Sequence, residues 1–94
     1  MNFISSPTNP HIKKIASLHT KKGRTEHNLF MVEGKRAIEP FLMAGWPCKE
    51  LILVGEEDNH FTEHTTQTEI TRITQPLMKK ISNATTPIGY IALF

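Results

Sequence analysis

The sequence predicts a small α/β domain in which helices pack on one sheet. Continuous apolar runs at 29–32 and 51–54 are typical of strands covered on both faces. Segments with helical spacing of apolar residues separate these runs, and alternation of strands and helices implies a layered α/β fold with crossover connections. With 94 residues, 38% of them hydrophobic, the chain has room for one compact domain and no large enzyme.

The first helix has a clear start. Asn9 is a good N-cap, and Pro10 suits the first helical position. Ile12, Ile15, Ala16 and His19 then recur at three- and four-residue intervals. Gly23 is predicted to end this helix or to open a loop, within the basic sequence KKGR at 21–24. We therefore expect a mobile, basic loop there.

The run 29–32 is predicted to be a strand in the centre of the sheet, and Gly34 marks the change to a second helix. Apolar residues continue with helical spacing over 37–45. Because Pro40 lies within this segment, the helix either begins late or bends there. The run 51–54 is a second buried strand.

The remaining chain is predicted to alternate in the same way. Residues 56–68 are polar and acidic and indicate an exposed loop with at most a short helical turn. A third strand follows at 70–73, a short helix at 76–81, and a last strand at 88–94. Natural chains usually finish in polar residues, whereas this one finishes in an apolar strand. We therefore expect a piece of a longer protein.

Several classes of protein are excluded. The longest nearly apolar stretch, 40–47, is far shorter than the roughly 20 residues of a membrane helix, and the N-terminus does not resemble a signal peptide. Cys48 has no second cysteine to pair with, which favours a reducing cytoplasm and a buried, unreactive thiol. His60 and His64 are spaced for a metal pair, but no third ligand is evident, so a solvated loop is favoured.

Charge is distributed unevenly along the chain, although the net charge is only +2. Residues 1–36 carry seven bases and two acids, a net charge of +5. Residues 37–70 carry one base and seven acids, a net charge of −6, and residues 71–94 carry three bases and no acid. If the two basic segments shared one face, that face would attract a polyanion; the alternative is an ordinary surface of mixed charge.

Four motifs together indicate a family. They are SPTNPHIK at 6–13, KKGR at 21–24 after Leu18, FMVEGKR at 30–36 and KISNATTPIG at 80–89. In this order and spacing they resemble the N-terminal substrate-binding domain of the SpoU (TrmH-type) RNA 2′-O-ribose methyltransferases. The resemblance implies a three-layer α/β/α sandwich with a small mixed sheet, similar to RNA-binding domains of a ribosomal protein and of kink-turn binders.

The same resemblance implies a function for residues 1–94 as the RNA substrate-binding domain of a longer enzyme. Its knotted C-terminal catalytic domain, which would bind S-adenosylmethionine and carry the catalytic residues, is not present in this chain. No catalytic, cofactor-binding or metal-binding residue is therefore assigned here. The expected partners are ribosomal or transfer RNA and the catalytic domain, and the full-length protein is expected to be a cytoplasmic homodimer.

RNA binding needs cations that meet phosphates and donors that meet ribose and base edges. The basic segment KKGR supplies charge, and two further bases begin the second helix, where the helix dipole adds to their attraction for phosphate. Hydroxyl groups after the last helix are possible donors to RNA. The predicted RNA-binding residues are Lys21, Lys22, Arg24, Lys35, Arg36, Ser82 and Thr86.

Each of these assignments has a structural alternative. KKGR is also compatible with a solvated turn, and Lys35 and Arg36 with surface ion pairs to Glu33 and Glu39. Ser82 is also suited to closing the preceding helix. Trp46, beside a proline, is predicted to pack rather than to stack on a base.

Two other functions remain open at the level of sequence. The chain is compatible with a stand-alone RNA-binding protein of the same fold that has no enzymatic activity. It is also compatible with a protein-interaction module that docks on its catalytic domain and does not touch RNA.

Overall fold

In the computed structural model, which describes residues 2–85 and 89–94, five strands form one mixed sheet. Strand β3 lies at its centre, parallel to β4 on one side and antiparallel to β5 on the other. Strand β1 extends the parallel half, and β2 extends the antiparallel half. The strands in spatial order are β1 (Asn2–Ile4), β4 (Glu69–Ile73), β3 (Glu50–Val54), β5 (Tyr90–Leu93) and β2 (Met31–Glu33).

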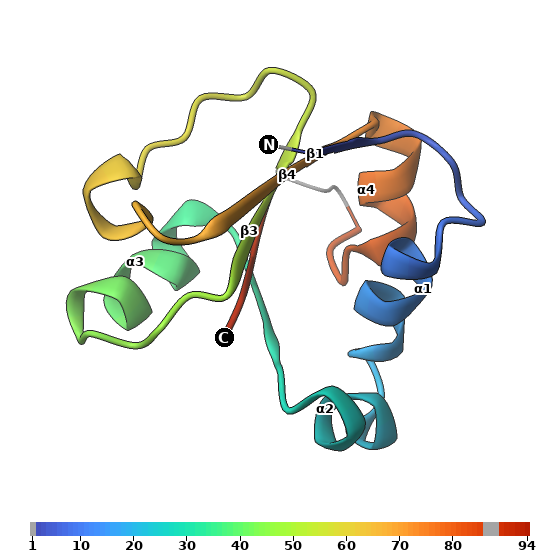
Figure 1. The fold of residues 1–94 in the computed structure, drawn as a ribbon, viewed down its shortest axis with the longest axis horizontal. Helices are drawn as coiled ribbons and strands as arrows, with labels where there is room; N and C mark the ends of the chain where they lie inside the picture. The colour runs from blue at the N-terminus through green and yellow to red at the C-terminus, as the bar shows by residue number, and fades with distance from the viewer. Residues whose placement is uncertain (1, 86–88) are drawn as a thin grey trace.

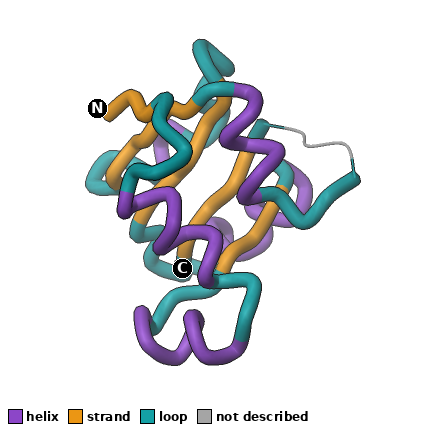
Figure 2. The backbone as a smooth tube through the Cα atoms, turned by 90° about the vertical axis from the view of Figure 1, so that its right-hand side faces the viewer, coloured by secondary structure: helices purple, strands orange, loops and turns teal. Residues whose placement is uncertain are grey.

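Helices cover both faces of the sheet, so the predicted three-layer α/β/α sandwich is confirmed (Figure 1). Helices α1 (Pro10–Ser17) and α4 (Gln75–Ile81) lie side by side on one face (Figure 2), and their apolar residues share a core cluster with Ile52 and Ile91. Helix α3 (Lys35–Met43) covers the other face, where it packs with Leu51, among others.

The predicted start of the first helix is confirmed. The side chain of Asn9 accepts a hydrogen bond from the backbone N–H of His11 at 2.8 Å, and Pro10 occupies the first helical position. The helix ends at Ser17, with Leu18 as its C-cap.

The basic segment 21–24 is not a loop, contrary to the prediction. It forms the first half of a second short helix, α2 (Lys21–His27), whose N-cap Thr20 accepts a hydrogen bond from the backbone N–H of Gly23 at 3.0 Å. Gly23 is buried, and a Cβ atom there would lie 1.9 Å from the carbonyl oxygen of Ser17. The glycine therefore permits α2 to approach the end of α1 closely, and it does not terminate a helix.

Gly23→Ala is expected to lower the free energy of unfolding by about 1 to 2 kcal/mol, because overpacking against backbone costs about that much. In an unhindered helix the same change stabilises by about 1 kcal/mol, so the sign of the effect is diagnostic. Urea unfolding followed by circular dichroism measures it. A variant more stable than the parent chain would contradict the close contact between α1 and α2.

The strand predicted at 29–32 is not central. Among the strands of the described residues, β2 pairs only with β5, and it lies at the edge of the sheet. Its apolar residues are nevertheless covered on both faces, since Met31 packs against the core cluster under α1 and α4, and Val32 packs against the cluster under α3. Here a continuous apolar run therefore indicates that the strand is covered on both faces, and it does not indicate a central position in the sheet.

Helix α3 begins at Lys35 and continues through Pro40, so the proline neither delays its start nor ends it. Gly34, with φ of 96°, provides the N-cap position. The structure confirms the other predicted elements, which are strands β3 and β4, helix α4 and the last strand. Ile88, the predicted start of the last strand, lies outside the described residues.

The predicted loop at 56–68 contains one short helical turn at Thr62–His64. Two of its side chains, Phe61 and Thr65, are buried, so the loop is anchored to the body of the domain. The three-residue strand β1 was not predicted from the sequence. Among the described residues, no helix has the length and apolar character needed to cross a membrane.

Candidate nucleic-acid interface

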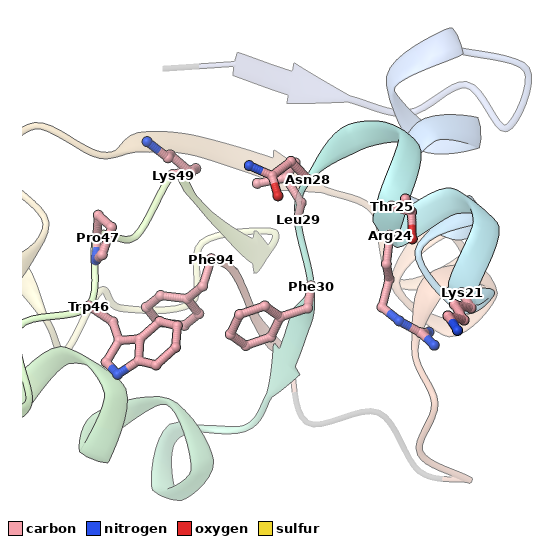
Figure 3. Close-up of a pocket in the computed structure, with 10 residues that line it drawn as sticks. All are labelled: Lys21, Arg24, Thr25, Asn28, Leu29, Phe30, Trp46, Pro47, Lys49 and Phe94. Carbon is pink, nitrogen blue, oxygen red and sulfur yellow. The ribbon is translucent and has the colours of Figure 1, made fainter.

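A hollow of about 680 Å³ lies where α2 and the start of β2 face the segment that precedes β3 (Figure 3). We call it the aromatic hollow because three aromatic rings lie together in it. Its lining residues are Lys21, Arg24, Thr25, Asn28, Leu29, Phe30, Trp46, Pro47, Lys49 and Phe94.

The aromatic rings of the hollow contact one another directly. The ring of Phe30 lies 5.9 Å from that of Phe94 in a stacked arrangement and 5.8 Å from that of Trp46 in an edge-on arrangement. Phe41 packs against all three rings, at 5.1 to 5.7 Å between centroids. Phe94 is buried, whereas the residue Trp46 is 49% exposed.

Three cations line the same hollow as these rings. Lys21 and Arg24 come from α2 on one side of the hollow, and Lys49 lies on the other side (Figure 3). None of the ten lining residues is acidic. The guanidinium of Arg24 also donates a hydrogen bond to the carbonyl oxygen of Leu18 at 3.0 Å, which fixes its position. Lys22 is exposed on the same helix but does not line the hollow.

Lys35 and Arg36 lie elsewhere. They begin α3, at the opposite end of β2 from α2, and they line a separate shallow hollow with Glu33. The ammonium group of Lys35 lies 5.4 Å from the centroid of the Tyr90 ring. In the part of the chain that the structure describes, neither residue forms an ion pair with a carboxylate, so the alternative of surface pairs is not seen.

Acidic groups lie close to this second basic site. Burial raises the pKa of the Tyr90 hydroxyl, and the nearby carboxylates of Glu57 and Asp58 raise it further. Glu33 also lines the same hollow as Lys35. The predicted basic residues are therefore divided between two places; an acid lines the hollow of this second basic site, whereas no acid lines the aromatic hollow.

Ser82 is the C-cap of α4, and its hydroxyl is already engaged. It donates to the carboxylate of Glu33 and accepts from the backbone N–H of Ala84 at 2.9 Å. The same carboxylate accepts from the backbone N–H of Asn83 at 3.0 Å, so Glu33 also helps to hold the segment after α4. The contacts favour the closing role of Ser82. Thr86, the other predicted hydroxyl donor, lies outside the described residues.

Lys49 was not predicted as a binding residue from the sequence, because the charged residues around it in the chain are acidic. It is the one base between residues 37 and 70. Pairing of β3 with β5 brings it beside the end of the sheet that faces α2, where its backbone N–H donates to the carbonyl oxygen of Leu93 at 2.8 Å. No local sequence pattern indicates this position, because it depends on the pairing of β3 with β5.

The remaining candidates have structural roles. Cys48 is half-buried rather than fully buried; this burial raises the pKa of its thiol, which also donates to the carbonyl oxygen of Glu50 at 3.4 Å. Of the residues that the structure describes, no three histidine, cysteine, aspartate or glutamate side chains are grouped to hold a metal ion. His60 instead lies beside the Tyr90 ring, 6.0 Å between centroids.

The three sandwich layers and the cation-lined hollow define a small α/β/α binding domain. Residues 9–92 match the family model of the MRM3-like substrate binding domain, and the chain therefore belongs to that family. The resemblance predicted from the sequence, to the substrate-binding domain of SpoU-type RNA 2′-O-ribose methyltransferases, is confirmed.

Relatives support this assignment in sequence and in structure. The 23S rRNA (guanosine(2553)-2′-O)-methyltransferase RlmP of Bacillus subtilis (strain 168) is 38% identical over 56 residues, which are 60% of this chain and 23% of RlmP. A solved RNA 2′-O ribose methyltransferase superposes with a TM-score of 0.82 at 30% identity, over 97% of this chain. An rRNA methyltransferase from Sinorhizobium meliloti gives a TM-score of 0.84 at 25% identity, over 99% of this chain.

The chain spans only a part of each of these relatives. It covers 36% of the length of both solved structures and 23% of RlmP.

Proposed function

We propose that this chain is the RNA-recognition domain of an S-adenosylmethionine-dependent 2′-O-ribose methyltransferase that acts on ribosomal or transfer RNA. It holds the substrate RNA so that a separate catalytic domain of the same protein, in a cytoplasmic homodimer, reaches the target ribose. Membership of a substrate-binding domain family carries this proposal. The name of RlmP, which includes 23S rRNA, supports ribosomal RNA as the substrate class.

The geometry of the aromatic hollow supports RNA as the ligand. Three cations line one hollow from two segments that are far apart in the sequence, Lys21 and Arg24 from α2 and Lys49 from the segment before β3, and no acid lines it. Such a set of cations attracts phosphates even though the net charge of the chain is only +2. Arg24 can contact a phosphate with two parallel hydrogen bonds.

The residues of this chain do not fit S-adenosylmethionine. The methyltransferase class binds that cofactor with glycine-rich loops, whereas the described glycines stand singly in separate turns or, for Gly23, inside a helix. We assign no residue here to the cofactor. The chemical step belongs to the catalytic domain, and this chain contributes binding and orientation.

Binding of an RNA fragment to the chain is expected to weaken as salt is raised. Three phosphate contacts predict a slope of about −2 to −3 for the logarithm of the association constant against the logarithm of salt concentration. The slope is measured by fluorescence anisotropy of a labelled rRNA fragment at salt concentrations from about 50 to about 200 mM. An affinity that does not change over this range would refute electrostatic recognition of RNA.

The enzymatic part of the proposal needs the full-length protein. Incubation with a labelled methyl donor and total RNA from a strain that lacks the gene is expected to label one nucleotide at its 2′ oxygen. Mapping that nucleotide identifies the substrate. RNA binding without any methyl transfer would instead support a stand-alone RNA-binding protein.

A further inference from the structure

Trp46 is a large apolar residue that remains exposed, and packing alone does not explain its exposure. Three large apolar side chains are exposed among the described residues, and they are Phe3, Met43 and Trp46. Of these, only Trp46 lines the aromatic hollow with its three cations. Phe3 lies on β1, at the opposite edge of the sheet.

The Trp46 ring packs against two other aromatic rings although the residue is 49% exposed. It meets the Phe30 ring at 85° and the Phe41 ring at 77°, both edge-on contacts that fix its orientation. Pro47 follows directly and restricts the backbone. An orientation fixed in advance lowers the entropy cost of binding a flat ligand against the ring.

Polar groups continue on the other side of Trp46. Trp46 and Lys49 also border a second hollow of about 440 Å³. Hydroxyl and amide groups of Thr66, Gln67 and Thr68 line that hollow, and none of its lining residues is acidic. Trp46 therefore stands between two hollows that both offer partners for an anionic, hydrogen-bonding chain.

We propose that Trp46 stacks on an unpaired base of the RNA while Lys21, Arg24 and Lys49 contact the flanking phosphates. The domain then selects a single-stranded segment or a loop, since bases inside an A-form duplex cannot present a face to a side chain. Stacking of bases on aromatic side chains beside a basic groove is how single strands are held without strict sequence preference. This inference rests on the proposed function and names the form of its substrate.

Trp46 is the one tryptophan of the sequence, so its fluorescence reports directly on this site. Titration of the chain with a short single-stranded RNA at low salt is expected to quench this fluorescence. The same strand annealed into a duplex is expected to bind through its phosphates without quenching. Heparin, a polyanion without bases, serves as a second probe that is expected to leave the emission unchanged.

Substitution of Trp46 tests the contribution of stacking to affinity. Trp46→Leu keeps an apolar contact with Phe30 and Phe41 but removes the flat ring. We expect it to weaken binding of the single strand about 5- to 10-fold, the lower part of the range for stacking of one base, and to leave duplex binding unchanged. Phe3→Leu is the matched control and is expected to change neither affinity. Circular dichroism verifies that both variants fold.

The outcomes separate this inference from the proposed function. RNA binding without quenching, with equal affinities of the parent chain and Trp46→Leu, would overturn stacking and leave RNA recognition intact. Absence of RNA binding at low salt would overturn both. A change of Trp46 emission with protein concentration alone, accompanied by dimer formation in sedimentation, would show that a second copy of the chain covers the ring, and would also overturn stacking.

Discussion

Replacement of Lys21 and Lys49 together by glutamine is expected to weaken binding of single-stranded RNA about 25-fold in 0.1 M salt. Each phosphate contact on a single strand contributes about 0.7 to the salt slope, so the loss of two contacts lowers the slope by about 1.4. The contribution of these phosphate contacts to the association constant vanishes at about 1 M salt. At about 0.1 M salt, the slope difference of about 1.4 therefore corresponds to an association constant about 25-fold lower. Anisotropy titrations at several salt concentrations measure both quantities.

The two lysines suit this test because their side chains form no hydrogen bond or ion pair within the described part of the chain. Their replacement should therefore leave the stability of the domain unchanged. Lys13→Gln with Lys79→Gln is a matched control, because it removes the same charge from exposed positions on α1 and α4 that do not line the hollow. Equal losses of affinity in the two double variants would show that net charge acts, and not the hollow.

Much of the fold could be predicted from local patterns. The cap at Asn9 and Pro10 and the apolar run of β3 are signals contained within a few residues, and both are confirmed. Gly23 misled the prediction because its role depends on Ser17 in the preceding helix, and a sequence does not show how closely two helices approach. The same limit applies to β2, whose edge position follows from pairing with β5 some 60 residues later.

The candidate site was predicted only in part, for a related reason. Charge counting along the chain grouped Lys35 and Arg36 with the basic segment of α2, but β2 separates the two groups. It also assigned Lys49 to an acidic segment, although the sheet places it across the hollow from Lys21. None of the acids around Lys49 in the sequence lines the aromatic hollow, and one of them, Glu50, is buried.

Glu50→Ala is expected to lower the free energy of unfolding by about 3 kcal/mol, the largest effect on stability that we predict. The Glu50 side chain is 9% exposed, and its carboxylate accepts a hydrogen bond from the hydroxyl of Thr71 at 2.6 Å. It also lies 2.7 Å from the ring nitrogen Nε2 of His11, whose side chain is 33% exposed. One carboxylate thus joins β3, β4 and α1, and its loss leaves the fully buried Thr71 hydroxyl without this acceptor.

The double variant Glu50→Ala, Thr71→Val distinguishes this network from a simple loss of volume. Valine has the shape of threonine without its hydroxyl, so the second change removes the unsatisfied group that the first one creates. We therefore expect the double variant to be less destabilised than the sum of the two single variants by about 1 kcal/mol or more. Urea unfolding followed by circular dichroism gives the three values. Additive losses would show that the hydroxyl of Thr71 does not depend on Glu50, and that the carboxylate stabilises the sheet through His11 alone.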